Sequence, residues 1–178
     1  MNNPARIRRV STLLKLACDA YLLVAPLLLA AIWLNFEQLG PQWQTLSQLP
    51  IQPQYVGLTN KLLGALITAI PLALLMYGVW RLRKLFEQFR QGRLFSEAGA
   101  DHLHAFAWML LITMLMAPVV SALLSLVLTM NNPPGEKALV ITLGSNDFGQ
   151  LFIAGALFAI TWTLREGYRL SQENEAFV

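Results

Sequence analysis

Four long apolar stretches constrain this chain more than any other feature of its sequence. They cover residues 13–34, 58–80, 103–130 and 148–164. A helix needs roughly 20 apolar residues to cross the hydrocarbon core of a bilayer, within a range of about 17 to 25. All four stretches meet this requirement, the last by a small margin, and none alternates as the strands of a membrane barrel do. They predict an all-α membrane protein, a bundle of four transmembrane helices.

The composition of the chain supports the same fold class. Of its 178 residues, 56% are hydrophobic and 13% are charged, whereas a soluble domain carries about 25% charged residues. Nothing in the pattern divides the chain, so we expect a single membrane domain over residues 1–178. The only cysteine, Cys18, excludes an internal disulfide and a multi-cysteine metal site.

The basic residues are distributed unevenly around the apolar stretches, and this sets the expected orientation. The N-terminal segment, the middle connection and the C-terminal tail hold 11 of the 13 Lys and Arg residues, and the other two are Lys61 and Lys137. The positive-inside rule therefore predicts that both termini and the connection 81–96 are cytoplasmic. The first stretch runs on through Trp33 without a clear cleavage site, so we expect an uncleaved anchor, not a signal peptide.

The two remaining connections are expected on the outer side. The first, 35–57, is polar and rich in proline, and the second opens with a turn sequence of Asn, Pro and Gly. The second continues as a β-branched run at 138–143, which favours a short strand. We expect a small extracytoplasmic strand pair between this run and residues 54–56, with an extended loop as the alternative. Either Asn146 or Asp147 is expected to cap the fourth helix.

The cytoplasmic connection, here called the elbow (residues 81–96), has an amphipathic pattern. Its large apolar residues recur at the spacing of one helix face, with basic residues between them. We expect the second helix to continue until Gly92, which readily takes the left-handed conformation that ends helices, and Ser96 to cap the next helix. Two interpretations stay open: an interfacial elbow whose cations reach anionic lipid headgroups, or a docking surface for a protein partner. The residues expected to make these contacts are Arg81, Leu82, Arg83, Lys84, Leu85, Phe86, Phe89, Arg90 and Arg93.

Few ionisable residues lie at membrane depth. Asp19 is the main candidate for a functional role, because intramembrane acids are costly, but Lys15 lies one helical turn before it and could pair with it. The two histidines, His102 and His104, point to different sides of a helix and cannot easily share one metal or haem. The chain carries no nucleophile, phosphate-loop or zinc motif. We therefore expect no metal, no cofactor, no enzymatic activity and no direct nucleic-acid binding.

The elbow and the tail together resemble a known family. The elbow carries Leu85 and Phe86 and then Gly-Arg-Leu-Phe-Ser at 92–96, and the tail runs from Arg165 through an acidic segment to Val178. This pattern is similar to the bacterial membrane family DUF2975, over most of the chain. The resemblance implies a location in the bacterial cytoplasmic (inner) membrane and no defined catalytic residues. Because members are often encoded beside small helix-turn-helix regulators, it also implies a signalling or regulatory role.

Two functions follow as hypotheses. The first is a non-enzymatic regulatory or accessory subunit that acts through the elbow and the tail, and the alternative is a small transporter or channel that depends on Asp19. The expected partners are membrane lipids, a cytoplasmic or membrane protein, or a second copy of the chain. A homodimer would use faces of small residues such as Gly64 and Ala65, which permit close helix packing.

Overall fold

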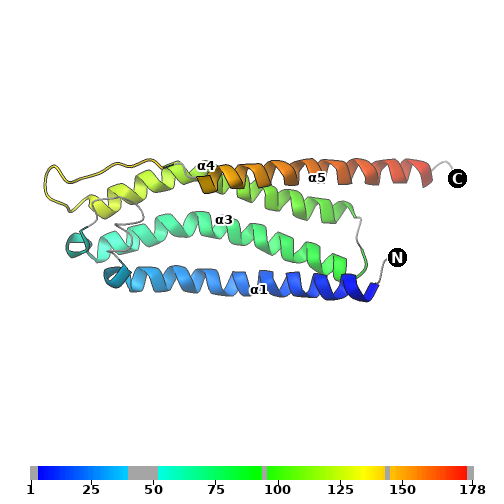
Figure 1. Cartoon of the computed structure of the whole chain (residues 1–178), viewed down its shortest axis with the longest axis horizontal. Helices are drawn as coiled ribbons and strands as arrows, with labels where there is room; N and C mark the ends of the chain where they lie inside the picture. Colours follow the sequence, from blue (N-terminus) through cyan, green and yellow to red (C-terminus); the bar gives the residue numbers. More distant parts are fainter. Residues whose placement is uncertain (1–3, 40–51, 94–95, 143–144, 176–178) are drawn as a thin grey trace. The chain divides into compact units, whose positions relative to one another are not determined.

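The structure is a computed structural model that describes residues 4–39, 52–93, 96–142 and 145–175 (Figure 1). Most of this part of the chain is helical. The elements are α1 (Pro4–Leu34), the 3-10 helix η1 (Pro53–Tyr55), α3 (Leu58–Arg90), α4 (Glu97–Thr129) and α5 (Ser145–Glu175). Each of α1, α3, α4 and α5 contains a stretch long and apolar enough to cross a membrane. The predicted all-α fold with four membrane-spanning helices is confirmed.

The helices are longer than the apolar stretches alone suggest. With a rise of about 1.5 Å per residue, the 31 residues of α1 extend about 46 Å, which exceeds the hydrocarbon thickness of about 30 Å. Helix α3, the second of the four long helices, continues to Arg90 as predicted for the elbow, and α5 continues through the tail to Glu175. Each helix therefore has room for charged residues beyond its membrane-spanning part.

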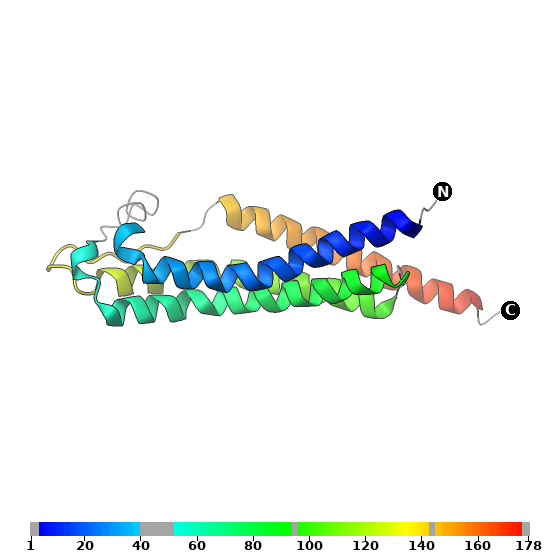
Figure 2. The same cartoon turned by 90° about the horizontal axis from the view of Figure 1, so that it is seen from below.

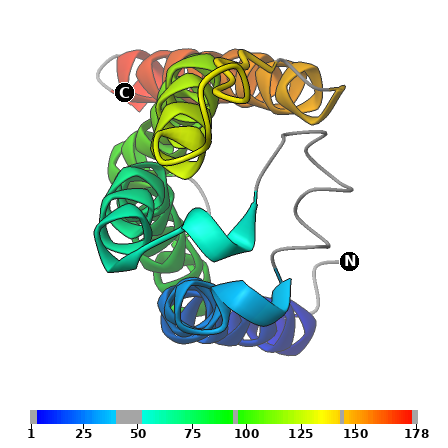
Figure 3. The same ribbon diagram turned by 90° about the vertical axis from the view of Figure 1, so that its left-hand side faces the viewer.

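The predicted strand pair does not form in the described residues. Pro53–Tyr55 is a 3-10 helix, and residues 136–142 are extended but pair with no strand. The alternative of an extended loop is therefore confirmed for those residues, while position 143 lies outside the described part. The loop doubles back along α4 (Figure 1), and in the end-on view it overlies that helix (Figure 3). Its backbone N–H groups donate to α4 hydroxyls in three bonds of 3.0 to 3.1 Å: Ala138 to Thr129, Val140 to Ser125, and Thr142 to Ser121.

The hydroxyls of Ser121, Ser125 and Thr129, here called the hydroxyl ladder, explain why the loop is extended without a partner strand. Four residues of helix advance about 6 Å, and two residues of extended chain advance about 6.6 Å. Hydroxyls on every fourth residue of α4 therefore match alternate amides of the loop. A buried backbone N–H without an acceptor costs about 1–3 kcal/mol. The α4 hydroxyls supply the hydrogen-bond acceptors that the carbonyl groups of a neighbouring strand would otherwise supply.

The start of α5 differs from the prediction. The helix begins at Ser145, so neither Asn146 nor Asp147 precedes it as a cap. Asp147 lies instead in the first turn. A carboxylate there interacts favourably with the positive end of the helix dipole.

The chain divides into two compact units. Unit 1 contains Met1–Leu23, Leu74–Met114 and Phe148–Val178, and unit 2 contains Val24–Ala73 and Leu115–Asp147. Helices α1, α3, α4 and α5 therefore all contribute residues to both units.

Unit 2 has a small core between its helices and loops. The buried residues Phe36, Val56 and Leu128 form its centre, and Trp33 stacks on Phe36 with ring centroids 5.5 Å apart. Asn60, almost fully buried, donates to the carbonyl oxygen of Val127 at 2.7 Å. The Asn60 hydrogen bond thus joins α3 to α4, and the contact of Phe36 with Leu128 joins the segment that follows α1 to α4.

Candidate functional site

The elbow ends α3 as its sequence predicts. Gly92 has φ +83°, in the left-handed region that favours glycine. Two bonds of 3.0 Å close the turn, from the Arg93 N–H to the Gln88 oxygen and from the Gly92 N–H to the Phe89 oxygen. This is the Schellman arrangement, which satisfies carbonyl groups at the end of a helix. The predicted stop at Gly92 is confirmed.

The second half of the elbow begins α4. The Gly99 N–H donates to the Ser96 hydroxyl at 3.1 Å, so Ser96 caps α4 as predicted. The same hydroxyl donates to Gln88 Oε1 at 3.0 Å, which ties the cap to the last turns of α3. Leu85 is only 5% exposed, and its side chain packs against Gly99. Leu85 therefore holds the elbow together within the chain.

Helices α1 and α3 run side by side in unit 1 (Figure 2), and two ion pairs join them. Lys15 pairs with Glu87 at 2.9 Å, and Asp19 pairs with Arg83. The expected pairing of Lys15 with Asp19 along α1 is therefore wrong, because each side chain finds an opposite charge on the neighbouring helix. In this antiparallel pair, a slip of one turn would place Lys15 opposite Arg83, and like charges repel. The two pairs thus favour one register of α1 against α3.

The remaining basic residues of the elbow are held in different ways. Lys84 Nζ lies 3.6 Å from the centroid of the Trp80 ring, a cation–π contact. Arg90 is fixed by Glu87 at 2.6 Å, three residues earlier on the same helix. Arg90 and Arg93 are both exposed. These two guanidinium groups are the part of the basic surface that another molecule can reach most easily.

The apolar face of the elbow is only partly covered. Leu82, Phe86 and Phe89 are half-buried. The rings of Phe86 and Phe89 meet edge to face, with centroids 6.3 Å apart. A partial apolar face beside exposed arginines is compatible with both sequence interpretations, lipid contact and protein docking.

A hydrogen-bonded histidine links α4 to α5 in unit 1. The Trp108 indole N–H donates to His104 Nε2 at 3.1 Å, and His104 Nδ1 lies 3.4 Å from the Thr161 hydroxyl. Because an indole N–H can only donate, Nε2 accepts and Nδ1 carries the proton. Thr161 is buried and donates to the Phe158 oxygen at 2.9 Å. His104 is therefore part of the contact between two helices.

Charged residues surround the same contact. Arg165 of α5 pairs with Asp101 of α4, and Arg81 of α3 donates to the Asp101 carbonyl oxygen at 3.4 Å. Together with His104 and Trp108 they line an open groove of about 420 Å³. The spacing of residues 101, 104 and 108 places them on one helix face, and this signal was available in the sequence. The approach of Arg81 and Arg165 from two other helices was not.

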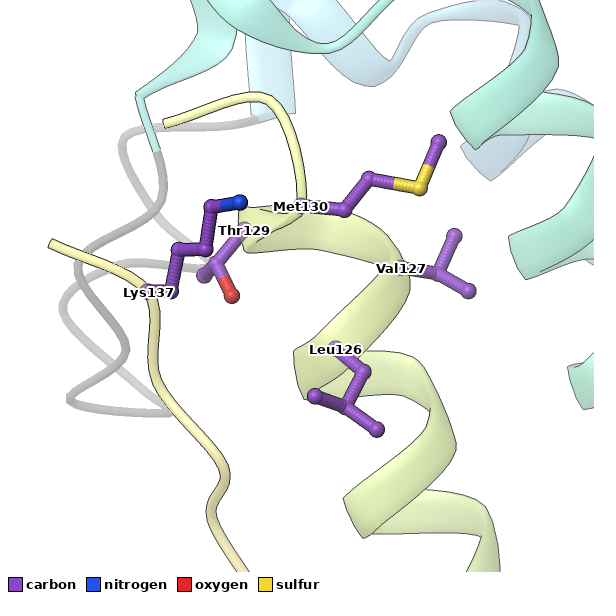
Figure 4. A pocket seen from close by; sticks show the side chains of 5 residues that line it. All are labelled: Leu126, Val127, Thr129, Met130 and Lys137. Carbon is purple, nitrogen blue, oxygen red and sulfur yellow. The ribbon is translucent and has the colours of Figure 1, made fainter. Parts of the chain in front are cut away.

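Unit 2 contains a second pocket, of about 300 Å³ (Figure 4). It lies under the loop that follows α4, and its lining is Leu126, Val127, Thr129, Met130 and Lys137. The Thr129 hydroxyl is already bonded to the Ser125 oxygen and to the loop. The pocket lining therefore has one cation, Lys137, among mostly apolar side chains, and it includes no acidic or basic residue that could act together with Lys137.

The histidines and acids of unit 1 do not assemble into a metal site. Within the described residues, no three His, Cys, Asp or Glu side chains come together as metal ligands would. The acids at positions 19, 87 and 101 are each bound by a basic side chain. These three acids therefore take part in ion pairs between helices.

Comparison with known families decides the classification. A family model described as a protein of unknown function, DUF2975, matches residues 19–178. The chain belongs to the DUF2975 family. The resemblance seen in the elbow and tail is thereby confirmed, and no curated protein or solved structure matches the chain. The elbow, Asp19 and the groove of unit 1 all lie inside the DUF2975 match, whereas Lys15 lies before it.

Proposed function

We propose that this DUF2975 protein is a non-enzymatic membrane protein of regulatory or accessory type, which binds a partner protein through the elbow. The observation that carries the proposal is the exposed basic surface of Arg90 and Arg93 on a turn that is capped on both sides. The Gly92 turn ends α3 on one side of this surface, and the Ser96 cap begins α4 on the other. A binding surface between two helix ends that are already formed loses less conformational entropy on binding than a fully flexible one.

The proposed orientation places the elbow in the cytoplasm of a bacterial cell. The distribution of 11 of the 13 basic residues supports this, by the positive-inside rule. The termini and the elbow would then face the same compartment, where a soluble regulator or the cytoplasmic part of another membrane protein can reach them.

The expected partner surface is acidic. A guanidinium group binds carboxylates through two parallel hydrogen bonds, which makes arginine well suited to protein interfaces. Leu85 is used for packing within the chain, so the half-buried Phe86 and Phe89 supply the apolar part of the contact. Association should weaken as salt is added, because exposed charges are screened over about 8 Å at physiological ionic strength.

The test uses crosslinking in the native membrane. A photo-activated amino acid at Gln91, between the two arginines, should crosslink the full-length protein to a specific partner. The double variant Arg90→Gln/Arg93→Gln should lose that product. The matched control Arg8→Gln/Arg9→Gln removes the same charge from exposed positions on α1 and should keep it. A missing crosslink in the wild type, or equal loss in both variants, would contradict the proposal.

The alternative, a small transporter or channel, rested on Asp19. That carboxylate is engaged by Arg83, and no observation favours the alternative over partner binding. An ion flux in proteoliposomes that disappears in Asp19→Asn would reverse this preference.

A further inference from the structure

The groove of unit 1 changes character along its length. Its lining residues on α4 include Asp101 at one end and Ile112 at the other, and they share one face of the helix. The eleven steps between them correspond to about 16 Å of helix. The groove therefore has a direction, from a charged end to an apolar end.

The charged end carries a net positive charge. It combines the guanidinium groups of Arg81 and Arg165 with the single carboxylate of Asp101. Both ring nitrogens of His104 are engaged, by Trp108 and Thr161. The Arg81 Nε atom is buried and has no hydrogen-bond acceptor among the described residues. Because that atom is buried, a ligand in the groove reaches Arg81 through its terminal nitrogens. Nη2 donates to the Asp101 carbonyl oxygen at 3.4 Å, and no carboxylate of the described residues forms an ion pair with Arg81. An anionic acceptor would give this guanidinium group a stronger, charge-assisted bond.

The apolar end is suited to a hydrocarbon chain. Met109 and Ile112 line it, and Tyr77 and Trp108 flank the transition at 45% and 46% exposure. Tyrosine and tryptophan are enriched where a protein passes from headgroups to hydrocarbon. Charged and apolar ends separated in this way match an amphiphile better than a soluble anion.

We propose that this groove binds one acidic phospholipid. Its phosphate would lie between Arg81 and Arg165, and the start of an acyl chain would lie along Met109 and Ile112. A phosphodiester with one negative charge neutralises the single net positive charge of the groove. A zwitterionic lipid brings its own cation and leaves that charge uncompensated. The groove volume of about 420 Å³ accommodates the headgroup and the first part of a chain, while the rest stays in the bilayer.

The proposal is independent of partner binding at the elbow, because it concerns a different ligand and a groove that excludes Arg90 and Arg93. The full-length protein, purified in mild detergent, is titrated with phosphatidylglycerol or with phosphatidylcholine of the same acyl chains. Native mass spectrometry then counts the lipids retained. We expect one phosphatidylglycerol per chain, held at least about fivefold more tightly than phosphatidylcholine.

Variants that are expected to change lipid affinity in opposite directions distinguish a loss of recognition from misfolding. Arg81→Gln and Arg165→Gln should each weaken phosphatidylglycerol binding by about fivefold to tenfold. Asp101→Asn removes the competing carboxylate and should tighten binding, which a misfolded protein would not do. Arg90→Gln, outside the groove, should leave binding unchanged.

Four outcomes would overturn the proposal. They are equal retention of the two lipids, an Arg81→Gln variant that behaves like Arg90→Gln, weaker binding in Asp101→Asn, and displacement of phosphatidylglycerol by inorganic phosphate. The last result would mean that the charged end holds a soluble phosphate and that the apolar end contributes nothing.

Discussion

Gly64 illustrates how much a single position controls in unit 2. The Trp33 indole lies directly on Gly64, so close that a β-carbon at that position would overlap the ring. The indole N–H donates to the Thr68 hydroxyl at 3.0 Å, which fixes the ring over the glycine. Gly64 was expected to belong to a close-packing face, and Trp33 of the same chain covers it. The homodimer suggested for that face stays a prediction without support from Gly64.

The substitution Gly64→Ala should destabilise the protein. The added methyl group displaces Trp33 from α3, and overpacking of this kind costs about 1–3 kcal/mol. The thermal unfolding midpoint of the purified protein should fall. The control is Gly155→Ala, where a β-carbon meets open space. It should leave the midpoint equal or raise it, because alanine is the better helix former by about 1 kcal/mol. Equal midpoints for the two variants would contradict the role of Gly64.

At the scale of elements, pairs of helices are held by matched charges and matched spacings. The crossed ion pairs of Lys15 with Glu87 and Asp19 with Arg83 favour one register of α1 against α3. The hydroxyl ladder attaches an extended loop to α4. The ion pairs and the hydroxyl ladder both depend on side chains that recur at a regular spacing along one element and on a second element whose partner groups recur at a matching spacing.

A charge-reversal cycle tests the register. Arg83→Asp places a second carboxylate beside Asp19 and should lower stability. The double variant Asp19→Arg/Arg83→Asp restores an opposite pair and should recover most of the loss. Half-exposed pairs contribute about 0.2–1 kcal/mol, so the coupling should fall in or slightly above that range. Denaturant unfolding of the wild type, Arg83→Asp, the single variant Asp19→Arg and the double variant measures the coupling. Losses that simply add would show that the pair does not couple the helices.

Removal of one hydroxyl tests the ladder. Ser125 is fully buried and accepts the Val140 N–H at 3.0 Å. In Ser125→Ala the amide loses its acceptor, at a cost of about 1–3 kcal/mol, and hydrogen exchange at Val140 should accelerate. Thr113→Val is the control, because the Thr113 hydroxyl bonds only to carbonyl groups of its own helix among the described contacts. Unchanged exchange at Val140 in Ser125→Ala would show that the bond does not hold the loop.

At the scale of the whole molecule, the orientation in the membrane is the property most open to direct test. In a Cys18→Ser background, single cysteines are placed at Gln91 in the elbow and at Lys137 in the loop after α4, both exposed. An impermeant maleimide added to intact cells should label position 137 at once and position 91 only after the membrane is opened. The reverse pattern would place the basic residues outside, against the positive-inside rule.

Much of the candidate site could be anticipated because its signals are local. Gly92 ends α3 and Ser96 caps α4 as predicted, since both depend on backbone conformation within a few residues. The predicted partner of Asp19, Lys15, was wrong, because a neighbour along the same helix competes with residues that packing brings from another helix, here Arg83. The run at 138–143 left a strand and an extended loop both open for a similar reason: the local pattern shows that the chain is extended, not what it pairs with.

The sequence by itself determined four membrane-spanning helices, their turns and their family, because hydrophobic length, glycine conformation and capping act over short distances. Only the tertiary structure decided which charges meet, that α4 hydroxyls replace a partner strand, and that Arg81, Asp101 and Arg165 share one groove. Those contacts join residues far apart in the chain. Their energies depend on how helices face one another, and helix periodicity alone leaves that rotation open.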